Sequence, residues 1–422
     1  MFNKHLTSRS ISRRHFLKSC AALGTLTAIS GFPAIIRSAE KEVRIGTTLP
    51  LTGPAASMGQ YIKIAQEIAV EEINEAGGIK SLGGARLKFF FSDHQMKNDV
   101  AMAESEKLIQ QGMHVMMGSY ASGVSLVTTQ VSERYKIPHL AEVPVADEIS
   151  QRGFKYVFQM DQNSSGAAKV MVDAVVGLGK HYGKIPKTAV FLHEDTLAGQ
   201  SMNKAWTEYC PKVGMKVLGT IMYPQRTTDV TTEIAKLKAM NPDVIMGMSY
   251  LSDAILIRRA MQKLRVNVMA YSDIGATNGP EYIQALGNLA DYVFASEGFS
   301  PFQKLAGSLE RGMKYQKRAN ADLMGPAGLS YSGVYVVKDA LERAGSLEPE
   351  KIREALAKTK IKAGEKGVLL PFDVEFDEKG YNKTAHILVC QILNNRRNPV
   401  YPLKFASMEA VWPTPTWEQR KL

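Results

Sequence analysis

The sequence predicts an α/β protein with two doubly wound lobes, each built on a parallel β-sheet that is covered by helices. Short apolar runs alternate with amphipathic segments along most of the chain, which is the pattern of repeated β-α units. At 422 residues the chain is longer than one hydrophobic core usually supports. No Pro/Gly/Ser-rich linker divides it, which favours lobes joined by crossing strands over tethered domains.

Residues 1–39 have the composition of a signal peptide. The segment Ser12–Lys18 carries a twin-arginine pattern at Arg13 and Arg14, and an apolar run over 20–36 follows it. This run is short and rich in small residues, so a membrane span is not expected. We predict export to the periplasm by the twin-arginine pathway, with cleavage near Ala39.

Charge and cysteine content narrow the class of protein further. Residues 1–39 carry six basic residues and no acidic ones, so their removal lowers the formal net charge from +11 to +5. The remaining charges are interspersed, and no basic run indicates nucleic-acid binding. Cys210 and Cys390 remain after cleavage, and the sequence permits either one disulfide or two free thiols.

Strands and helices alternate in order along the exported chain. The predicted strands are residues 43–47, 87–91, 114–117, 137–140, 189–192, 217–221, 244–246 and 268–270. The predicted helices are residues 61–76, 99–111, 124–135, 166–182, 200–213, 231–240 and 254–264. We expect Gly77 and Gly78 to end the first helix and Asp99 to cap the second.

The segment 114–123 is the first candidate site, because a buried strand there breaks into a loop of small polar residues and then a helix. The first N–H groups of a helix have no intrahelical partner, and in parallel sheets this edge is where ligands bind. Ser119 and Ser122 add hydroxyl groups. The plain alternative is an ordinary strand-to-helix loop with a serine cap.

Sequence motifs for catalysis are missing. No Gly-x-Ser-x-Gly elbow, Walker loop or Cys-x-x-Cys pair occurs, and no Gly-x-Gly-x-x-Gly turn follows the first strand. The cluster His193, Glu194 and Asp195 ends a predicted strand, where adjacent side chains point to opposite sides. We therefore predict a protein that is not an enzyme and has no metal site and no cofactor.

Two longer segments resemble a known family. Ile45–Pro54 contains Leu-Thr-Gly-Pro, and Glu71–Ile79 ends in Ile-Asn-Glu-Ala-Gly-Gly-Ile. Both are similar to the branched-chain amino acid-binding proteins of bacterial ABC transporters, which have the type I periplasmic-binding-protein fold. Gly118–Ser122 and Tyr331–Tyr335 match in register, so the resemblance covers nearly all of the exported chain.

The resemblance implies that three segments, near 159–161, 296–299 and 371–378, cross between the lobes as a hinge. Each lobe is then discontinuous in sequence. The implied division is lobe 1 at 40–160 and 298–372, lobe 2 at 161–297 and 373–405, and a C-terminal tail at 406–422.

The resemblance also implies a set of ligand-binding residues. In the family, the loop that matches Ser119, Tyr120, Ala121 and Ser122 binds the ligand carboxylate through a serine hydroxyl and backbone N–H groups, and Ser122 preserves that serine. Val143 and Val145 lie in the next loop, where the family supplies a threonine hydroxyl. Leu197 replaces an aromatic residue of the family. Tyr250 matches a tyrosine, and Asp273 matches an acidic residue. The resemblance thus implies that the carboxylate end is partly kept, that Asp273 can serve as an ammonium partner, and that the side-chain pocket is altered.

Asp273 is the candidate partner for a ligand ammonium group. We expect it just after the strand 268–270, and no Lys or Arg lies between Arg265 and Lys304 to compensate a buried carboxylate. We hypothesise that an ammonium or amide N–H of the ligand does so. The alternatives are a partner from elsewhere in the chain, exposure to solvent, or an Asp at a loop bend before Gly275.

The predicted function is that of a monomeric periplasmic solute-binding protein. It would capture an amino acid, an amide or an organic acid, including an aromatic one, and deliver this small-molecule ligand to the permease of an ABC transporter. The alternative is a periplasmic sensory receptor with the same two-lobed closure. Neighbouring permease and ATPase genes would favour transport, and a neighbouring sensor kinase would favour signalling.

Overall fold

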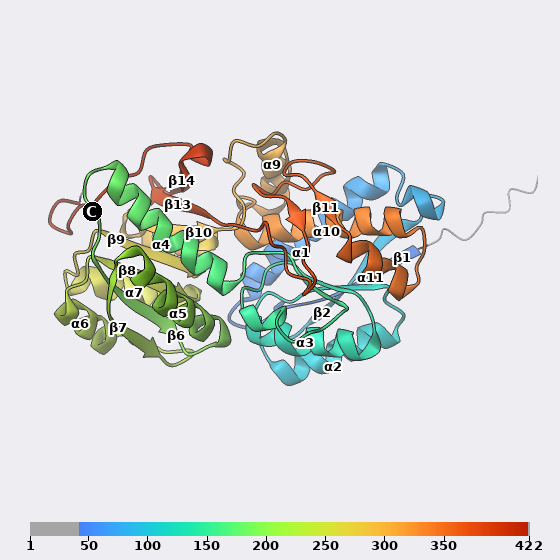
Figure 1. The fold of residues 1–422 in the computed structure, drawn as a ribbon, viewed down its shortest axis with the longest axis horizontal. Helices are drawn as coiled ribbons and strands as arrows, with labels where there is room; N and C mark the ends of the chain where they lie inside the picture. Colours follow the sequence, from blue (N-terminus) through green and yellow to red (C-terminus); the bar gives the residue numbers. More distant parts are fainter. Residues whose placement is uncertain (1–41, 421–422) are drawn as a thin grey trace, which may run out of the picture. The chain divides into compact units, whose positions relative to one another are not determined.

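The computed structural model describes residues 42–420 and contains two main sheets (Figure 1). The first is five-stranded, with the order β2-β1-β3-β4-β5, and every neighbouring pair is parallel. Its strands are β1 (Glu42–Leu49), β2 (Arg86–Asp93), β3 (Val115–Gly118), β4 (His139–Ala141) and β5 (Val157–Gln159).

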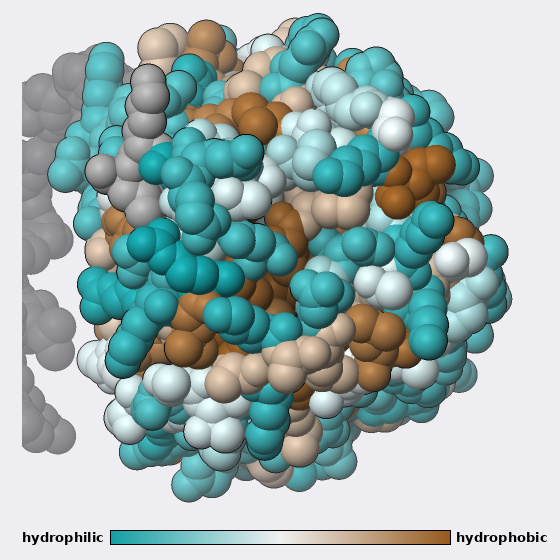
Figure 2. Space-filling view, turned by 90° about the vertical axis from the view of Figure 1, so that its left-hand side faces the viewer, coloured by the Kyte–Doolittle hydropathy of each residue, from teal (hydrophilic) through white to brown (hydrophobic). Residues whose placement is uncertain are grey.

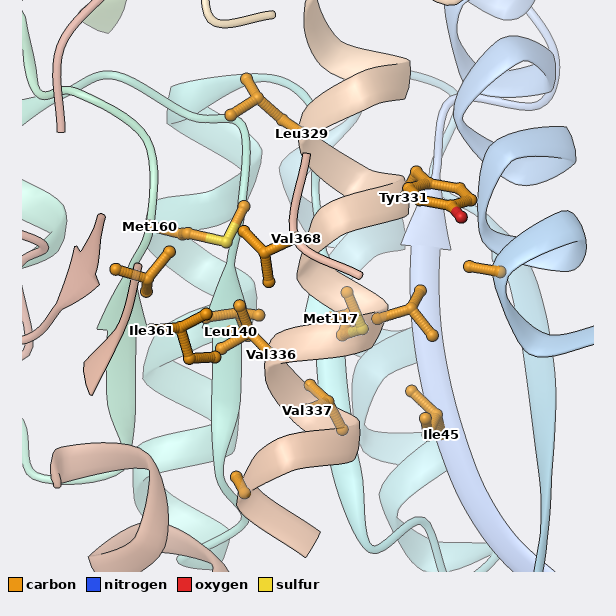
Figure 3. Close-up of a cluster of buried hydrophobic side chains, with 14 of the residues drawn as sticks. Ile45, Met117, Leu140, Met160, Leu329, Tyr331, Val336, Val337, Ile361 and Val368 are labelled. Carbon is orange, nitrogen blue, oxygen red and sulfur yellow. The ribbon is translucent and has the colours of Figure 1, made fainter. Parts of the chain in front are cut away.

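Helices cover both faces of this first sheet. Residues Val115 and Met117 of β3 pack on one side, and Met116 between them packs on the other, as strand alternation requires. The helices of the first side are α1 (Ala56–Glu75), α9 (Ser308–Ala319), α10 (Gly325–Ala344) and α11 (Pro349–Ala357). Those of the second side are α2 (Asn98–Gln110) and α3 (Ser122–Tyr135). Figure 3 shows the core on the first side, where Val336 and Val337 of α10 lie among Ile45, Met117 and Leu140.

The second sheet is seven-stranded, with the order β14-β13-β10-β9-β8-β6-β7. The strands β6 to β10 pair in parallel, and β13 and β14 add an antiparallel edge. Its strands are β6 (Thr188–Glu194), β7 (Lys216–Tyr223), β8 (Val244–Ser249), β9 (Ala270–Gly275), β10 (Val293–Glu297), β13 (Leu388–Leu393) and β14 (Arg396–Tyr401). A separate short pair joins β11 (Lys360–Ile361) to β12 (Val374–Glu375).

Helices also cover both faces of the second sheet. On one face lie α4 (Ser164–His181) and α5 (Leu197–Tyr209), and on the other lie α6 (Thr231–Met240), α7 (Leu251–Lys263) and α8 (Pro280–Leu286). We call each sheet with its helices a lobe, the first around β1–β5 and the second around β6–β10. After β10 the chain returns to the first lobe through α9, α10 and α11, and β13 and β14 then complete the second sheet (Figure 1).

The C-terminal segment packs on the second lobe. Trp412 joins the core beside α4 and α5, and Trp417 joins the core on the opposite face. The indole N–H groups of both tryptophans donate to backbone carbonyls, those of Lys184 and Val266. Figure 2 views the second-lobe end of the molecule, where hydrophobic residues occur in separate groups among hydrophilic ones.

Most predicted elements are confirmed, and three details are corrected or settled. β9 spans Ala270–Gly275 rather than 268–270, so its carboxyl end lies several residues later. Asp99 lies in the first turn of α2 and does not cap it, because Lys97 occupies the cap position. Cys210 and Cys390 are both free and buried.

The predicted signal peptide and its twin-arginine motif lie outside the described residues. Within 42–420, no helix is both long enough and apolar enough to span a membrane.

Candidate functional site

Two adjoining cavities lie between the carboxyl edges of the two sheets. The smaller has a volume of about 60 Å³ and the larger about 510 Å³, and both are lined by Tyr120 of the first lobe and Tyr250 of the second. The smaller pocket is lined by Tyr120, Ser122, Val143, Pro144, Val145, Asp161, Ala198, Met248, Tyr250, Ile274, Gly275, Ser296, Gly298, Gly325, Pro326, Leu329 and Ile387. The lining of the smaller pocket is therefore mainly apolar and comes from both lobes.

The start of α3 forms one wall of the cavities. Ser125 donates the first intrahelical N–H bond, to the carbonyl of Ala121, so the N–H groups of residues 122–124 precede the hydrogen-bonded helix. Ser122 lines the smaller pocket, while Ala121 lines the larger cavity. The Ser122 hydroxyl accepts a 3.2 Å bond from the N–H of Ala146, which leaves its own proton free to donate. This wall therefore offers several donors to an anion.

Ser119, in contrast, is turned into the first lobe. Its hydroxyl lies 2.5 Å from that of Thr48, and it lines neither cavity. The carbonyl of Ser119 accepts a hydrogen bond from the Ser125 hydroxyl. The structure thus contradicts the expected position of Ser119 in the cleft and gives this residue a role in holding the loop.

Two buried residues of the β4 region fix the end of β3. A carboxylate oxygen of Glu142 accepts the N–H of Gly118 at 2.9 Å, and Nε2 of His139 lies 2.9 Å from the carbonyl of Gly118. Gln66 and Ser330 donate to the other oxygen of Glu142. Burial raises the pKa of Glu142 and lowers that of His139 to about 4. No local sequence pattern marks Glu142, because its partners Gln66, Gly118 and Ser330 lie on other segments of the chain.

Val143 and Val145 line the smaller pocket with methyl groups where the family resemblance expected a threonine hydroxyl. The loop that carries them is held by Gln159, whose side-chain amide donates to the carbonyls of Pro144 and Ala146 at 2.9 and 3.1 Å. This loop therefore adds apolar surface rather than a polar anchor.

The second lobe contributes Tyr250 and Leu197. Tyr250 immediately precedes α7, and its N–H donates to both carboxylate oxygens of Asp253 at 3.1 Å. Its ring meets that of Tyr120 edge to face, with centroids 6.2 Å apart. Leu197 lines the larger cavity. The two tyrosine rings border both cavities and bring the lobes into contact.

Asp273 does not lie where the sequence predicts it. It is a buried residue within β9, it lines neither cavity, and the next residue, Ile274, lines the smaller pocket instead. Its carboxylate oxygens accept hydrogen bonds from Ser249, at 2.8 and 2.9 Å, and from Tyr271, at 2.9 Å. Partners on β8 and β9 thus compensate the buried carboxylate, which a ligand ammonium or amide N–H was expected to do.

Several polar residues of the cavities are absent from the sequence-predicted set, and three of them are buried at or after strand ends. Asp161 and Ser296 line the smaller pocket, and Glu194 lines the larger cavity. Burial raises the pKa of Asp161 to about 8 and that of Glu194 to about 7, and the nearby carboxylate of Asp253 adds to the shift of Glu194. Their position after or at the end of strands β5, β6 and β10 was a usable signal.

Direct hydrogen bonds also cross the cleft. The Tyr61 hydroxyl on α1 donates to Glu281 on α8 at 2.9 Å, and the Ser201 hydroxyl on α5 donates to Glu148 of the first lobe at 2.9 Å. The lobes are therefore closed on each other in this structure. Within residues 42–420, no group of three or more His, Cys, Asp or Glu side chains is placed to hold a metal ion.

Comparison with known proteins gives a family match over most of the chain. The model of the family described as "Periplasmic binding protein" matches residues 42–385. "Leu/Ile/Val-binding protein homolog 8" of Brucella suis biovar 1 (strain 1330) is 27% identical over 395 residues, which are 90% of this chain and 95% of that protein.

Solved structures share the fold. The branched-chain amino acid transporter substrate binding protein of Streptococcus pneumoniae, in complex with isoleucine, aligns with a TM-score of 0.74 and 20% identity, over 85% of this chain and 98% of that one. An ABC transporter solute binding protein from R. palustris, in complex with benzoate, aligns with a TM-score of 0.74 and 16% identity, over 88% of this chain and 98% of that one.

Proposed function

This chain belongs to the periplasmic binding protein family, and we propose that it is the solute-binding protein of an ABC transporter. On this proposal it captures a small carboxylate with an apolar body between its lobes and delivers it to a membrane permease. We also propose that the protein is a monomer and that it acts in the periplasm, after cleavage of a twin-arginine signal peptide within residues 1–39.

We infer the class of ligand from one observation: the start of α3 lies at the wall of a pocket that is lined mainly by apolar side chains. Ser122 and the first N–H groups of α3 supply donors for an anion. The described residues that line the smaller pocket include no Lys or Arg. An anion bound there would depend on hydroxyl and backbone donors, which suit a single carboxylate better than a multiply charged phosphate.

The apolar lining supports a ligand whose body is hydrocarbon. Val143, Val145, Met248, Ile274 and Leu329 come from both lobes, so closure buries the ligand on two sides. Isoleucine and benzoate, the ligands named for the two compared structures, each join a carboxylate to such a body. Because Asp273 is already hydrogen-bonded within the second lobe, an ammonium group is not required of the ligand.

Closure is the means of capture in this proposal. The hinge consists of the segments near 159–161, 296–299 and 371–378, with lobe limits at 40–160, 161–297, 298–372 and 373–405. Ligand that contacts Ser122 of one lobe and Tyr250 of the other favours the closed state over the open one.

A thermal-shift screen tests the ligand class. Protein freed of bound ligand by unfolding and refolding would be scanned with aliphatic amino acids, their amides and aromatic acids. A ligand that binds only the folded protein raises the melting temperature, by an amount that grows with its concentration over Kd. A rise with carboxylates of apolar body supports the proposal, and no rise with any of them contradicts it.

A further inference from the structure

The smaller pocket contains two buried polar groups that the carboxylate site does not use. Ser296 is 1% exposed and Asp161 is 5% exposed, and both line this pocket. Buried polar atoms in folded proteins nearly always have a hydrogen-bond partner, and leaving one unpaired is costly. An unpaired group that borders a cavity therefore indicates what the cavity takes up.

The hydroxyl of Ser296 has no partner among the described residues. Its direction follows from the alternation of β10: Phe294, two residues earlier, packs on the face of the second sheet that also holds Met248, Ile274 and Ile387. Those three residues line the smaller pocket. Ser296 thus lies on the pocket side of the strand, with its hydroxyl among apolar side chains.

Asp161 lies between β5 of the first lobe and α4 of the second. One carboxylate oxygen accepts the N–H of the next residue, Gln162, at 2.7 Å, and the other oxygen has no hydrogen bond within the described part of the chain. No Lys or Arg of that part forms an ion pair with it, and among the residues that line the smaller pocket it is the only Asp, Glu, Lys, Arg or His. An acid in these surroundings favours the neutral form, which can both donate and accept a hydrogen bond.

We propose that Asp161 and Ser296 form a polar subsite that takes a hydroxyl group carried on the apolar body of the ligand. This inference rests on the proposed function, because it assumes that the ligand carboxylate lies at the start of α3. A hydroxyl can donate to one of the two side chains and accept from the other, which would satisfy both at once. The preferred ligands are then hydroxylated small carboxylates, such as hydroxybenzoates, over their plain counterparts.

The test compares matched acids on matched variants. Calorimetry would give Kd for benzoate and for 2-, 3- and 4-hydroxybenzoate on the wild type, on Ser296→Ala and on Asp161→Leu. The control is Ser272→Ala, since Ser272 is also a buried serine with an unpaired hydroxyl, lies on the neighbouring strand β9 and lines neither cavity. Leucine and 4-methylpentanoate form a second pair that differs only by an ammonium group.

We expect at least one hydroxybenzoate to bind the wild type and Ser272→Ala about tenfold more tightly than benzoate, which is the loss expected when a buried polar pair finds no partner. In Ser296→Ala and Asp161→Leu this preference should fall to threefold or less. The preference is the ratio of the Kd for benzoate to the Kd for the hydroxybenzoate in one variant. A general loss of stability weakens both ligands alike and leaves this ratio unchanged.

Three results would overturn the inference. One is benzoate binding as tightly as every hydroxybenzoate to the wild type. Another is a preference that Ser296→Ala and Asp161→Leu leave unchanged. The third is leucine binding more tightly than 4-methylpentanoate with a difference that Asp161→Leu removes, because the subsite would then take an ammonium. Absence of binding by all these acids would instead refute the proposed function itself.

Discussion

The Tyr61 hydroxyl donates a 2.9 Å hydrogen bond to Glu281, and this bond joins α1 of the first lobe to α8 of the second. Such a bond exists only when the lobes are closed, so it stabilises the closed state without touching the smaller pocket. A bond that stabilises the closed state should also raise the affinity for a ligand that binds this state.

Tyr61→Phe should therefore weaken ligand binding. A partly exposed hydrogen bond contributes roughly 0.5–1.5 kcal/mol, so calorimetry should show about a two- to tenfold rise in Kd. Tyr209→Phe is the matched control, because its hydroxyl donates to Asp173 at 2.8 Å within one lobe. Equal effects of the two substitutions would argue against a role of the cleft-edge bond in closure.

Ser122→Ala tests the anion wall. Removing a hydroxyl that donates to a charged ligand should cost about 1.5–3 kcal/mol, which is roughly a 10- to 150-fold rise in Kd. Thr129→Ala changes a hydroxyl on the same helix that lines neither cavity, and it should leave Kd unchanged. If Ser122→Ala binds as tightly as the wild type, with a normal melting temperature, Ser122 is not a ligand donor.

Asp273→Asn should act on stability rather than on ligand choice. Its carboxylate is held by Ser249 and Tyr271 inside the second lobe, so the amide would leave one of these donors without an acceptor. We expect a loss of about 1–3 kcal/mol in the free energy of unfolding and equal changes in Kd for leucine and 4-methylpentanoate. A larger loss for leucine would restore Asp273 as the partner of an ammonium group.

The pH dependence of stability follows from buried acids. Burial is the main cause of the raised pKa of four carboxyl groups, which is about 8 for Asp161 and Glu297 and about 7 for Glu194 and Asp273. The unfolded chain releases these protons near pH 4, so between the two pKa values the folded state holds more protons. Raising the pH through this range therefore favours unfolding.

Two buried histidines act in the opposite direction, but only at lower pH. The pKa values of His94 and His139 are lowered to about 4 by burial, so their effect on stability ends near pH 6.5. From pH 6.5 to 8 the acids dominate, and the four pKa values together should lower the free energy of unfolding by up to about 5 kcal/mol in chemical denaturation. Asp161→Asn should flatten this slope. A stability that rises over the same range would contradict the assignment.

Local sequence patterns predicted most strands and helices up to β9, because period-two and helical spacing are read within one segment, but β5, β10, β13, β14 and the helices α8 to α11 were not predicted. They predicted α3 and marked Ser122 at its start, and the structure places this residue beside the smaller pocket. They failed for Asp273, since an error in the limits of β9 changed which residue faces the cleft: Ile274 lines the pocket, and Asp273 pairs with Ser249 on the next strand. They also missed Asp161 and Ser296, which lie far apart in the sequence and line one pocket only in the folded protein.

The central claim is that the start of α3 holds the carboxylate of the ligand. Calorimetry on ligand-free wild-type protein tests it most directly, with each acid compared with its own amide: leucine with leucinamide, and benzoate with benzamide. The amide keeps the apolar body and removes the negative charge, which is what Ser122 and the helix N–H groups should recognise. We predict one-to-one binding in which the preferred acid binds at least about tenfold more tightly than its amide. Binding of the amide as tightly as the acid would contradict the claim.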